Sequence, residues 1–140
     1  MCGMGLLKVN LKKWNDMITE LKDNQIFVFG SNARGHHAGG AARQAVEQFG
    51  AIWGQAKGLQ GQSYGIVTLD EKLNKVSLYS IRLQLVQLAE FAAAHPDKEF
   101  LLTPIGCGIA GFQVREIRAE VLDIWWPDNV VLPEEFERTF

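Results

Sequence analysis

The sequence predicts an α/β fold: a single three-layer α/β/α domain around a mixed, mostly parallel sheet. Short, wholly apolar runs such as 26–29 alternate with segments whose apolar residues recur at helical spacing. A strand that is apolar on both faces is typical of a parallel sheet covered by helices on each side. With 140 residues, the chain has the length of one domain with a substantial core.

Apolar periodicity predicts these elements in order: helix 11–21, strand 26–29, helix 41–49, loop 50–62, strand 63–68, helix 77–94, strand 99–105, helix 114–126 and strand 129–132. Residues 1–9 are expected to form a flexible N-terminus. Asn10 is a suitable N-cap for the first helix, and Pro96 ends the longest one. Four glycines in the loop 50–62 predict a segment packed under Trp53. In the last helix, Val114 and Trp125 are expected to face inward.

Composition and charge exclude several classes of protein. The chain is 47% hydrophobic and 21% charged, as expected of a globular domain. Its net charge of −2 argues against general binding to nucleic acid or to an anionic membrane surface. No apolar run is long enough to span a membrane, and the first residues do not resemble a signal peptide. Cys2 and Cys107 are not placed to form a structural disulfide, so we expect a cytoplasmic protein.

Two glycine-rich loops, each between a predicted strand and a predicted helix, carry the main functional signal. The first covers 30–40 and the second 106–112. Glycine lets backbone amides turn toward a ligand, and a following helix N-terminus favours anions, so such loops hold phosphates. Because both follow strands of a parallel sheet, we expect them to face each other at its carboxyl edge. The predicted ligand-binding residues are Gly30, Ser31, Gly39, Gly40, Thr68, Gly106, Cys107, Gly108, Ile109, Ala110, Gly111 and Phe112.

The second loop also fits two other interpretations. Gly106, Gly108 and Gly111 spell G-x-G-x-x-G, the outline of a dinucleotide-binding fingerprint. That motif normally opens a dinucleotide-binding fold, whereas here only one predicted strand follows it, so this is a minor alternative. The other interpretation is a tight turn that needs glycine for its backbone angles alone.

The segments FVFGSNARGHHAGGAA and LLTPIGCGIAGF, in this order, resemble the macro domain, a module that binds ADP-ribose. The segment SYGIVTLD at 63–70 is similar to one in a compact macro-like branch found in phages and bacteria. The resemblance spans 26–133. It implies that Asn32 takes the place of the macro-domain Asn and that 106–112 is the diphosphate loop. The Asp that holds adenine in macro domains has no counterpart before Ile26.

Four residues are candidates for catalysis: Asn32, His36, His37 and Asp70. Asn32 would hold a ribose hydroxyl or orient a water, or else form an Asx turn. One of the two histidines would transfer a proton, or both are solvated loop residues. Asp70 would act as a base or hold a ribose, or else belong to a turn. We expect no metal, because the histidines lack a ligand spacing, and no cofactor.

Cys107 is also a potential nucleophile, but Arg115 is eight positions on and not six, as the C-x5-R loop of cysteine phosphatases requires. We interpret Cys107 as a small loop residue and the four tryptophans as packing residues. The resemblance therefore implies binding of ADP-ribose or a related nucleotide diphosphate sugar, with hydrolysis of an ADP-ribose phosphate or ADP-ribosyl ester as one outcome. The alternatives are a reader without catalysis, including a reader of ADP-ribosylated protein, and a nucleotide-binding module without chemistry.

Overall fold

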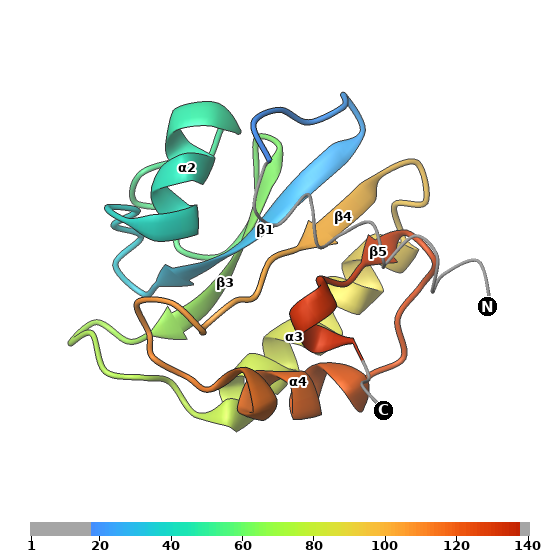
Figure 1. Ribbon diagram of the computed structural model, residues 1–140. Helices are drawn as coiled ribbons and strands as arrows, with labels where there is room; N and C mark the ends of the chain where they lie inside the picture. The colour runs from blue at the N-terminus through green and yellow to red at the C-terminus, as the bar shows by residue number, and fades with distance from the viewer. Residues whose placement is uncertain (1–17, 138–140) are drawn as a thin grey trace.

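The computed structural model describes residues 18–137 and confirms the predicted fold class. Its strands are β1 (Gln25–Asn32), β2 (Gly58–Gln60), β3 (Ser63–Leu69), β4 (Glu99–Leu102) and β5 (Val130–Val131). Its helices are α2 (Gly40–Gln48), α3 (Leu78–Ala93), α4 (Val114–Leu122) and the short 3-10 helix η1 (Glu134–Phe136). The strands form one sheet in the order β2-β3-β1-β4-β5 (Figure 1).

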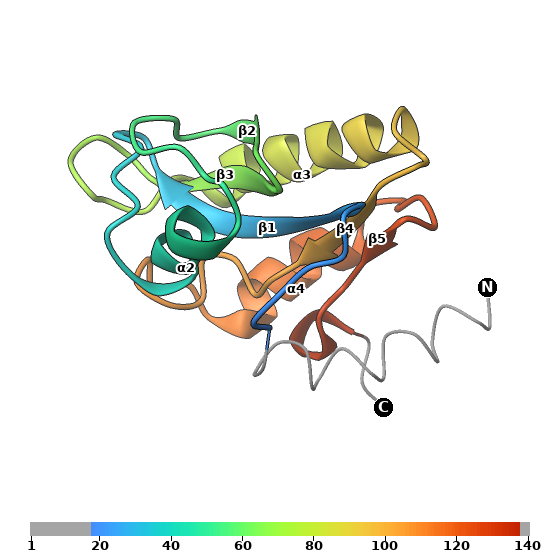
Figure 2. The ribbon, with the colours of Figure 1, turned by 90° about the horizontal axis from the view of Figure 1, so that it is seen from above.

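Strand β1 lies at the centre of the sheet, and its alternating side chains define the layers. Ile26 and Val28 face the larger core, which α3 and α4 cover. Phe27 and Phe29 face the opposite side and pack against α2. All four side chains are at most 2% exposed, which explains why this strand has no polar face. Figure 2 shows α2 on one side of the sheet, with α3 and α4 on the other.

The pairing of the strands brings three loops to one edge of the sheet. β1 runs parallel to both β3 and β4, with Gly30 opposite Ile66 and Val28 opposite Leu102. β5 continues the parallel arrangement beside β4, whereas β2 is an antiparallel edge strand beside β3. The carboxyl ends of β1, β3 and β4 are therefore neighbours, which is where parallel sheets bind ligands.

Several predicted boundaries need correction. The strand predicted over 99–105 ends at Leu102, because Pro104 has no amide to donate and Ile105 turns back to Thr103. The helix predicted over 114–126 ends at Leu122. Just beyond it, the Trp126 indole donates to the carbonyl of Val121 at 2.9 Å and satisfies an acceptor of the last turn.

Two predictions of inward packing were wrong. Trp125, which follows α4, is 75% exposed, and Val114, the first residue of α4, is 36% exposed. Trp53, in the segment 50–62, is 57% exposed. That segment also contains β2, whose Gly, Leu and Gln carry no apolar pattern and pair with β3 through backbone alone.

The predicted N-terminal features lie mostly beyond the described residues. The flexible segment 1–9 and residues 11–17 of the predicted first helix fall outside them. Residues 18–21, the remainder of that helix, are irregular and not helical. There, Leu21 packs against Leu101 and Val131, on the face of the sheet that α2 leaves open.

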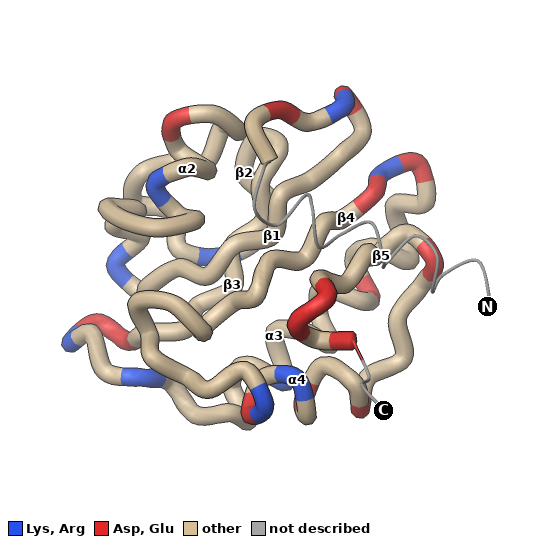
Figure 3. The backbone as a smooth tube through the Cα atoms, in the orientation of Figure 1, with Lys and Arg blue, Asp and Glu red and all other residues tan. Residues whose placement is uncertain are grey.

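Charged residues are scattered over the outer segments in Figure 3, whereas β1 and the loop 103–113 contain none. Arg43 pairs with Glu47 on the surface of α2, and Arg82 pairs with Glu120 and Asp123 between α3 and α4. Within the described residues, every helix is too short or too polar to cross a bilayer.

Candidate ligand-binding site

The two glycine-rich loops meet at one cavity of about 450 Å³ at the carboxyl edge of the sheet. Small-molecule sites typically have volumes of roughly 300–1,000 Å³. The two backbones come close at its floor, where a Cβ added to Gly30 would lie 3.4 Å from the amide nitrogen of Gly106. The predicted residues that line it are Gly30, Ser31, Asn32, His36, Gly39, Gly40, Thr68, Gly106, Gly108, Ile109 and Ala110.

One wall of the cavity is the N-terminus of α2. Gly39 is its N-cap, with extended backbone angles and no side-chain hydrogen bond to the helix. The first backbone bond at this end runs from the amide of Arg43 to the carbonyl of Gly39, so the amides of Gly40, Ala41 and Ala42 have no partner within the helix. These amides and the helix dipole favour an anion at this wall.

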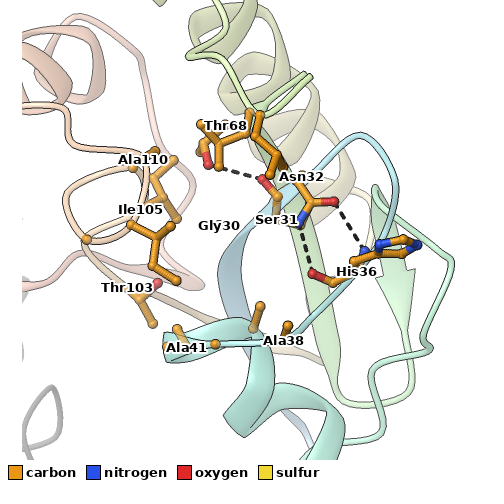
Figure 4. A pocket seen from close by; sticks show the side chains of 18 of the residues that line it. Gly30, Ser31, Asn32, His36, Ala38, Ala41, Thr68, Thr103, Ile105 and Ala110 are labelled. Atoms are coloured by element: carbon orange, nitrogen blue, oxygen red, sulfur yellow. Dashed lines mark hydrogen bonds between the residues drawn. The ribbon is translucent and has the colours of Figure 1, made fainter. Parts of the chain in front are cut away.

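The opposite wall is a tight turn in the second loop. The amide of Gly111 donates to the carbonyl of Gly108 at 3.0 Å, which places Ile109 and Ala110 at the centre of the turn. Among the described residues, the amides of Gly108, Ile109 and Ala110 donate to no protein acceptor. Figure 4 shows Ala110 and Ala41 on different sides of the cavity. We call the two sets of amides, 40–42 and 108–110, the anion cradle.

Behind this turn, Gly106 and Phe112 fix the path of the chain. Gly106 has φ +76°, a conformation that favours glycine, and its Cβ would lie 3.1 Å from the Phe112 ring. The amide of Phe112 donates to the carbonyl of Gly106 at 2.8 Å, while its side chain is buried in the core. Phe112 therefore supports the loop from beneath and does not line the cavity.

Apolar side chains border the cavity mouth. Ile109 is 75% exposed and reaches across to α2, since a Cβ on Gly39 would lie 3.1 Å from its Cδ1. Leu73 is 53% exposed, has φ +65° and comes from the loop after β3. That loop is shaped by Asp70, whose Oδ1 accepts from the amides of Lys72 and Asn74, both at 2.9 Å. Asp70 is thus a turn residue outside the cavity lining.

Asn32 organises the first loop with both ends of its side-chain amide. Its Oδ1 accepts from the backbone amides of Arg34 and His36, at 3.1 and 3.2 Å. Its Nδ2 donates to the carbonyl of His36 at 2.9 Å (Figure 4). This is the Asx-type arrangement that the sequence left open as an alternative. Oδ1 already accepts two hydrogen bonds, and Nδ2 keeps one N–H for a ligand or a water, so the main role of Asn32 is to hold the loop.

The hydroxyl groups around the cavity are also used within the protein. Ser31 donates to the carbonyl of Ala56, and Thr68 donates to the carbonyl of Ser31 at 3.0 Å. Thr103 donates to the carbonyl of Val28 at 2.7 Å. These hydroxyl groups are thus engaged within the protein, whereas the backbone amides of the anion cradle have no acceptor among the described residues.

The two adjacent histidines point in different directions, and neither ring faces the cavity. His36 lines it, yet its imidazole is turned away in Figure 4 and stacks on Trp53. His37 is 2% exposed, and its Nε2 bonds to the carbonyl of Gln55 at 2.9 Å. Its Nδ1 is buried without a partner, and its ring meets the edge of Phe29. His37 is a core residue beneath the first loop.

Cys107 is half-buried within the second loop and lies outside the cavity lining. Burial raises the pKa of its thiol to about 11, and the carboxylates of Glu135 and Glu116 add to this rise. Its Sγ lies 3.5 Å from the carbonyl of Ile105. A thiol with this pKa is neutral at physiological pH, which is unfavourable for a nucleophile.

The sequence missed part of the lining. Gly111 was predicted but, like Cys107 and Phe112, does not line the cavity. The lining residues that were not predicted are Ala38, Ala41, Ala42, Leu69, Leu73, Thr103, Pro104 and Ile105. Ala41 and Ala42 lie in the first turn of α2, and Ala38 lies just before it. An Ala-rich helix start directly after a glycine loop is the sequence signal that could have identified them.

No Lys, Arg, Asp or Glu is among the described residues that line the cavity. The cation beside the second loop is Lys75, whose Nζ lies 5.0 Å from the centre of the Phe112 ring. Its Cε would lie 3.8 Å from a Cβ on Gly111. Nor do the described residues contain a group of His, Cys, Asp or Glu arranged to hold a metal ion.

Comparison of the chain with models of protein families, with curated proteins and with solved structures gave no match.

Proposed function

We propose that the chain binds ADP-ribose or a related nucleotide diphosphate sugar and that the anion cradle holds its diphosphate. The observation that carries this proposal is the convergence of two sets of unpaired backbone amides, from α2 and from the turn 108–111, on one cavity. Each set alone favours an anion, and their opposition suits a ligand with two adjacent phosphates.

The arrangement of the loops agrees with the resemblance to macro domains. The loop after β1 leads into the small, Ala-rich start of α2, and the loop after β4 supplies the turn opposite it. A Cβ built on Gly108 meets no heavy atom within 4 Å, so phosphate oxygens have room to approach the backbone of the turn. Free or protein-linked ADP-ribose is the ligand class we propose, in a cytoplasmic setting consistent with the free thiol of Cys107.

Binding without hydrolysis is the better supported form of this function. Of the four titratable candidates, His37 and Cys107 are packed away from the cavity and Asp70 is held in a turn. His36 is the remaining one, and its imidazole stacks on Trp53 and is turned from the cavity. General acid–base catalysis needs a side chain within hydrogen-bond reach of the reacting atoms.

Titration calorimetry with ADP-ribose tests the proposal. We expect saturable binding at one site per chain, with a rise in thermal stability when the ligand is added. Ligand at about 100 times its Kd adds about 2.7 kcal/mol to the free energy of unfolding. Absence of both heat and thermal shift at millimolar ADP-ribose would refute the proposal.

A turnover assay separates the reader from the hydrolase. The substrates are ADP-ribose phosphate and mono-ADP-ribosylated protein, and the products measured are inorganic phosphate and free ADP-ribose. We expect binding of ADP-ribose with no release of either product. Turnover that falls about 10²- to 10⁴-fold in His36→Ala would instead identify a hydrolase in which His36 transfers the proton.

A further inference from the structure

An aromatic pair lies at the rim of the cavity and has no part in the anion cradle. The rings of His36 and Trp53 are stacked, with centroids 5.1 Å apart and an interplanar angle of 13°. His36 belongs to the cavity wall, and Trp53 lies in the loop between α2 and β2. We call this pair the aromatic platform.

The platform is held in place by contacts between its two loops. The amide of Gly54 donates to the carbonyl of Gly35 at 2.8 Å. A Cβ on Gly35 would lie 2.4 Å from the carbonyl carbon of Gly54, so the two backbones are in close contact. On the other side of Trp53, the amide of Ile52 donates to Oε1 of Gln60 at 2.8 Å. These contacts hold the backbone on both sides of Trp53, and the His36 ring holds one face of its indole. A site that is ordered before a ligand binds loses less entropy on binding.

Packing of the protein itself does not account for the position of Trp53. Its side chain is 57% exposed and belongs to none of the three buried clusters formed by the described residues. His36 stacks on its indole, and its exposed surface is available to a planar group. Nucleobases stack on such rings with little dependence on base identity.

We propose that the aromatic platform stacks the nucleobase of the ligand whose diphosphate the anion cradle holds. A nucleotide diphosphate has an anionic group that suits the anion cradle and a planar base that suits the aromatic platform. This inference rests on the proposed function and adds the position of the base, for which the sequence offered no acidic residue.

The test compares two ligands with the variants Trp53→Ala and Trp53→Phe. ADP-ribose carries the base, whereas inorganic pyrophosphate carries only the diphosphate. We expect Trp53→Ala to weaken ADP-ribose binding roughly 5- to 150-fold in calorimetry, the range for loss of one stacked base, and Trp53→Phe to retain most of the affinity. The thermal shift produced by millimolar pyrophosphate should be the same in all three proteins.

The control is Trp125→Ala. Trp125 is 75% exposed and lines a separate groove beside α3, so its loss should leave both ligands unaffected. Equal weakening of both ligands by Trp53→Ala would mean that Trp53 only braces the first loop, and unchanged ADP-ribose affinity would exclude stacking. Either result overturns the inference while the proposed function stands. A wild-type protein that responds to neither ligand overturns both.

Discussion

Replacement of Gly108 by valine tests the anion cradle without disturbing the fold. A Cβ built on Gly108 meets no heavy atom within 4 Å, and its φ lies outside the left-handed range. The residue is exposed and lines the cavity, so the new side chain would occupy space that a ligand needs. We expect the free energy of unfolding to stay within about 1 kcal/mol of wild type.

The expected loss of binding follows from the amides of the turn. A hydrogen bond to a charged group contributes about 1.5–3 kcal/mol. Blocking one amide of the turn 108–111 therefore weakens ADP-ribose binding roughly 10- to 150-fold, and blocking two weakens it more. Gly108→Ala, with a smaller side chain, should give an intermediate loss. The assay is calorimetry with ADP-ribose, alongside urea unfolding of each variant.

Gly106→Ala is the matched control for stability. Gly106 has φ +76°, and its Cβ would lie 3.1 Å from the Phe112 ring, so this alanine should cost about 1–3 kcal/mol of stability. The contrast between the two glycines separates effects on the fold from effects on the ligand. A folded Gly108→Val protein with wild-type affinity for ADP-ribose would remove the phosphate-binding role of the second loop.

Three further predictions follow from the site. Asn32→Ala removes three hydrogen bonds of the first loop. It should lower the free energy of unfolding, measured with urea, by about 1–3 kcal/mol, and it should weaken ADP-ribose binding in calorimetry. A loss of turnover alone would contradict the structural role of Asn32. His37→Ala should lower the free energy of unfolding, measured with urea, by about 2–4 kcal/mol because the ring is buried. A loss below 0.5 kcal/mol, about that of a surface substitution, would show that the ring is exposed. The rate of Cys107 alkylation by iodoacetamide should still increase above pH 9, because the pKa of its thiol is raised to about 11. That pKa lies above the reference value of 9.0, so the contribution of the thiol to the free energy of unfolding is present below pH 9 and is lost as the pH rises through 11. A rate that levels off by pH 9 would contradict this.

The sequence predicted the layers of the fold and the meeting of the two glycine loops because both depend on local patterns. The run 26–29 is apolar at every position, which is typical of a strand covered on both faces. The glycine loops follow β1 and β4, and parallel pairing of these strands places them side by side. Nothing about side-chain orientation within the loops was needed for that inference.

The parts that were missed depend on contacts distant in sequence or on a single side chain. The positive φ of Leu73 belongs to a turn held by the carboxylate of Asp70, which periodicity does not reveal. The last helix was predicted too long because its apolar spacing continues to Trp126, whose indole caps the helix instead of extending it. The burial of His37 depends on Gln55, in a loop 18 residues further along the chain.

The central position of β1 has a consequence for synthesis of the chain on the ribosome. Both partners of this strand come later, and Gln25 pairs with Glu99, 74 residues further on. At about 5–20 residues per second, β1 waits roughly 4–15 s for β4 after leaving the peptidyl-transferase centre. Its other partner, β3, is synthesised before β4 and is therefore available sooner to cover one edge of β1. Because the turn 108–111 is synthesised later still, the ligand cavity can form only when most of the chain has been made.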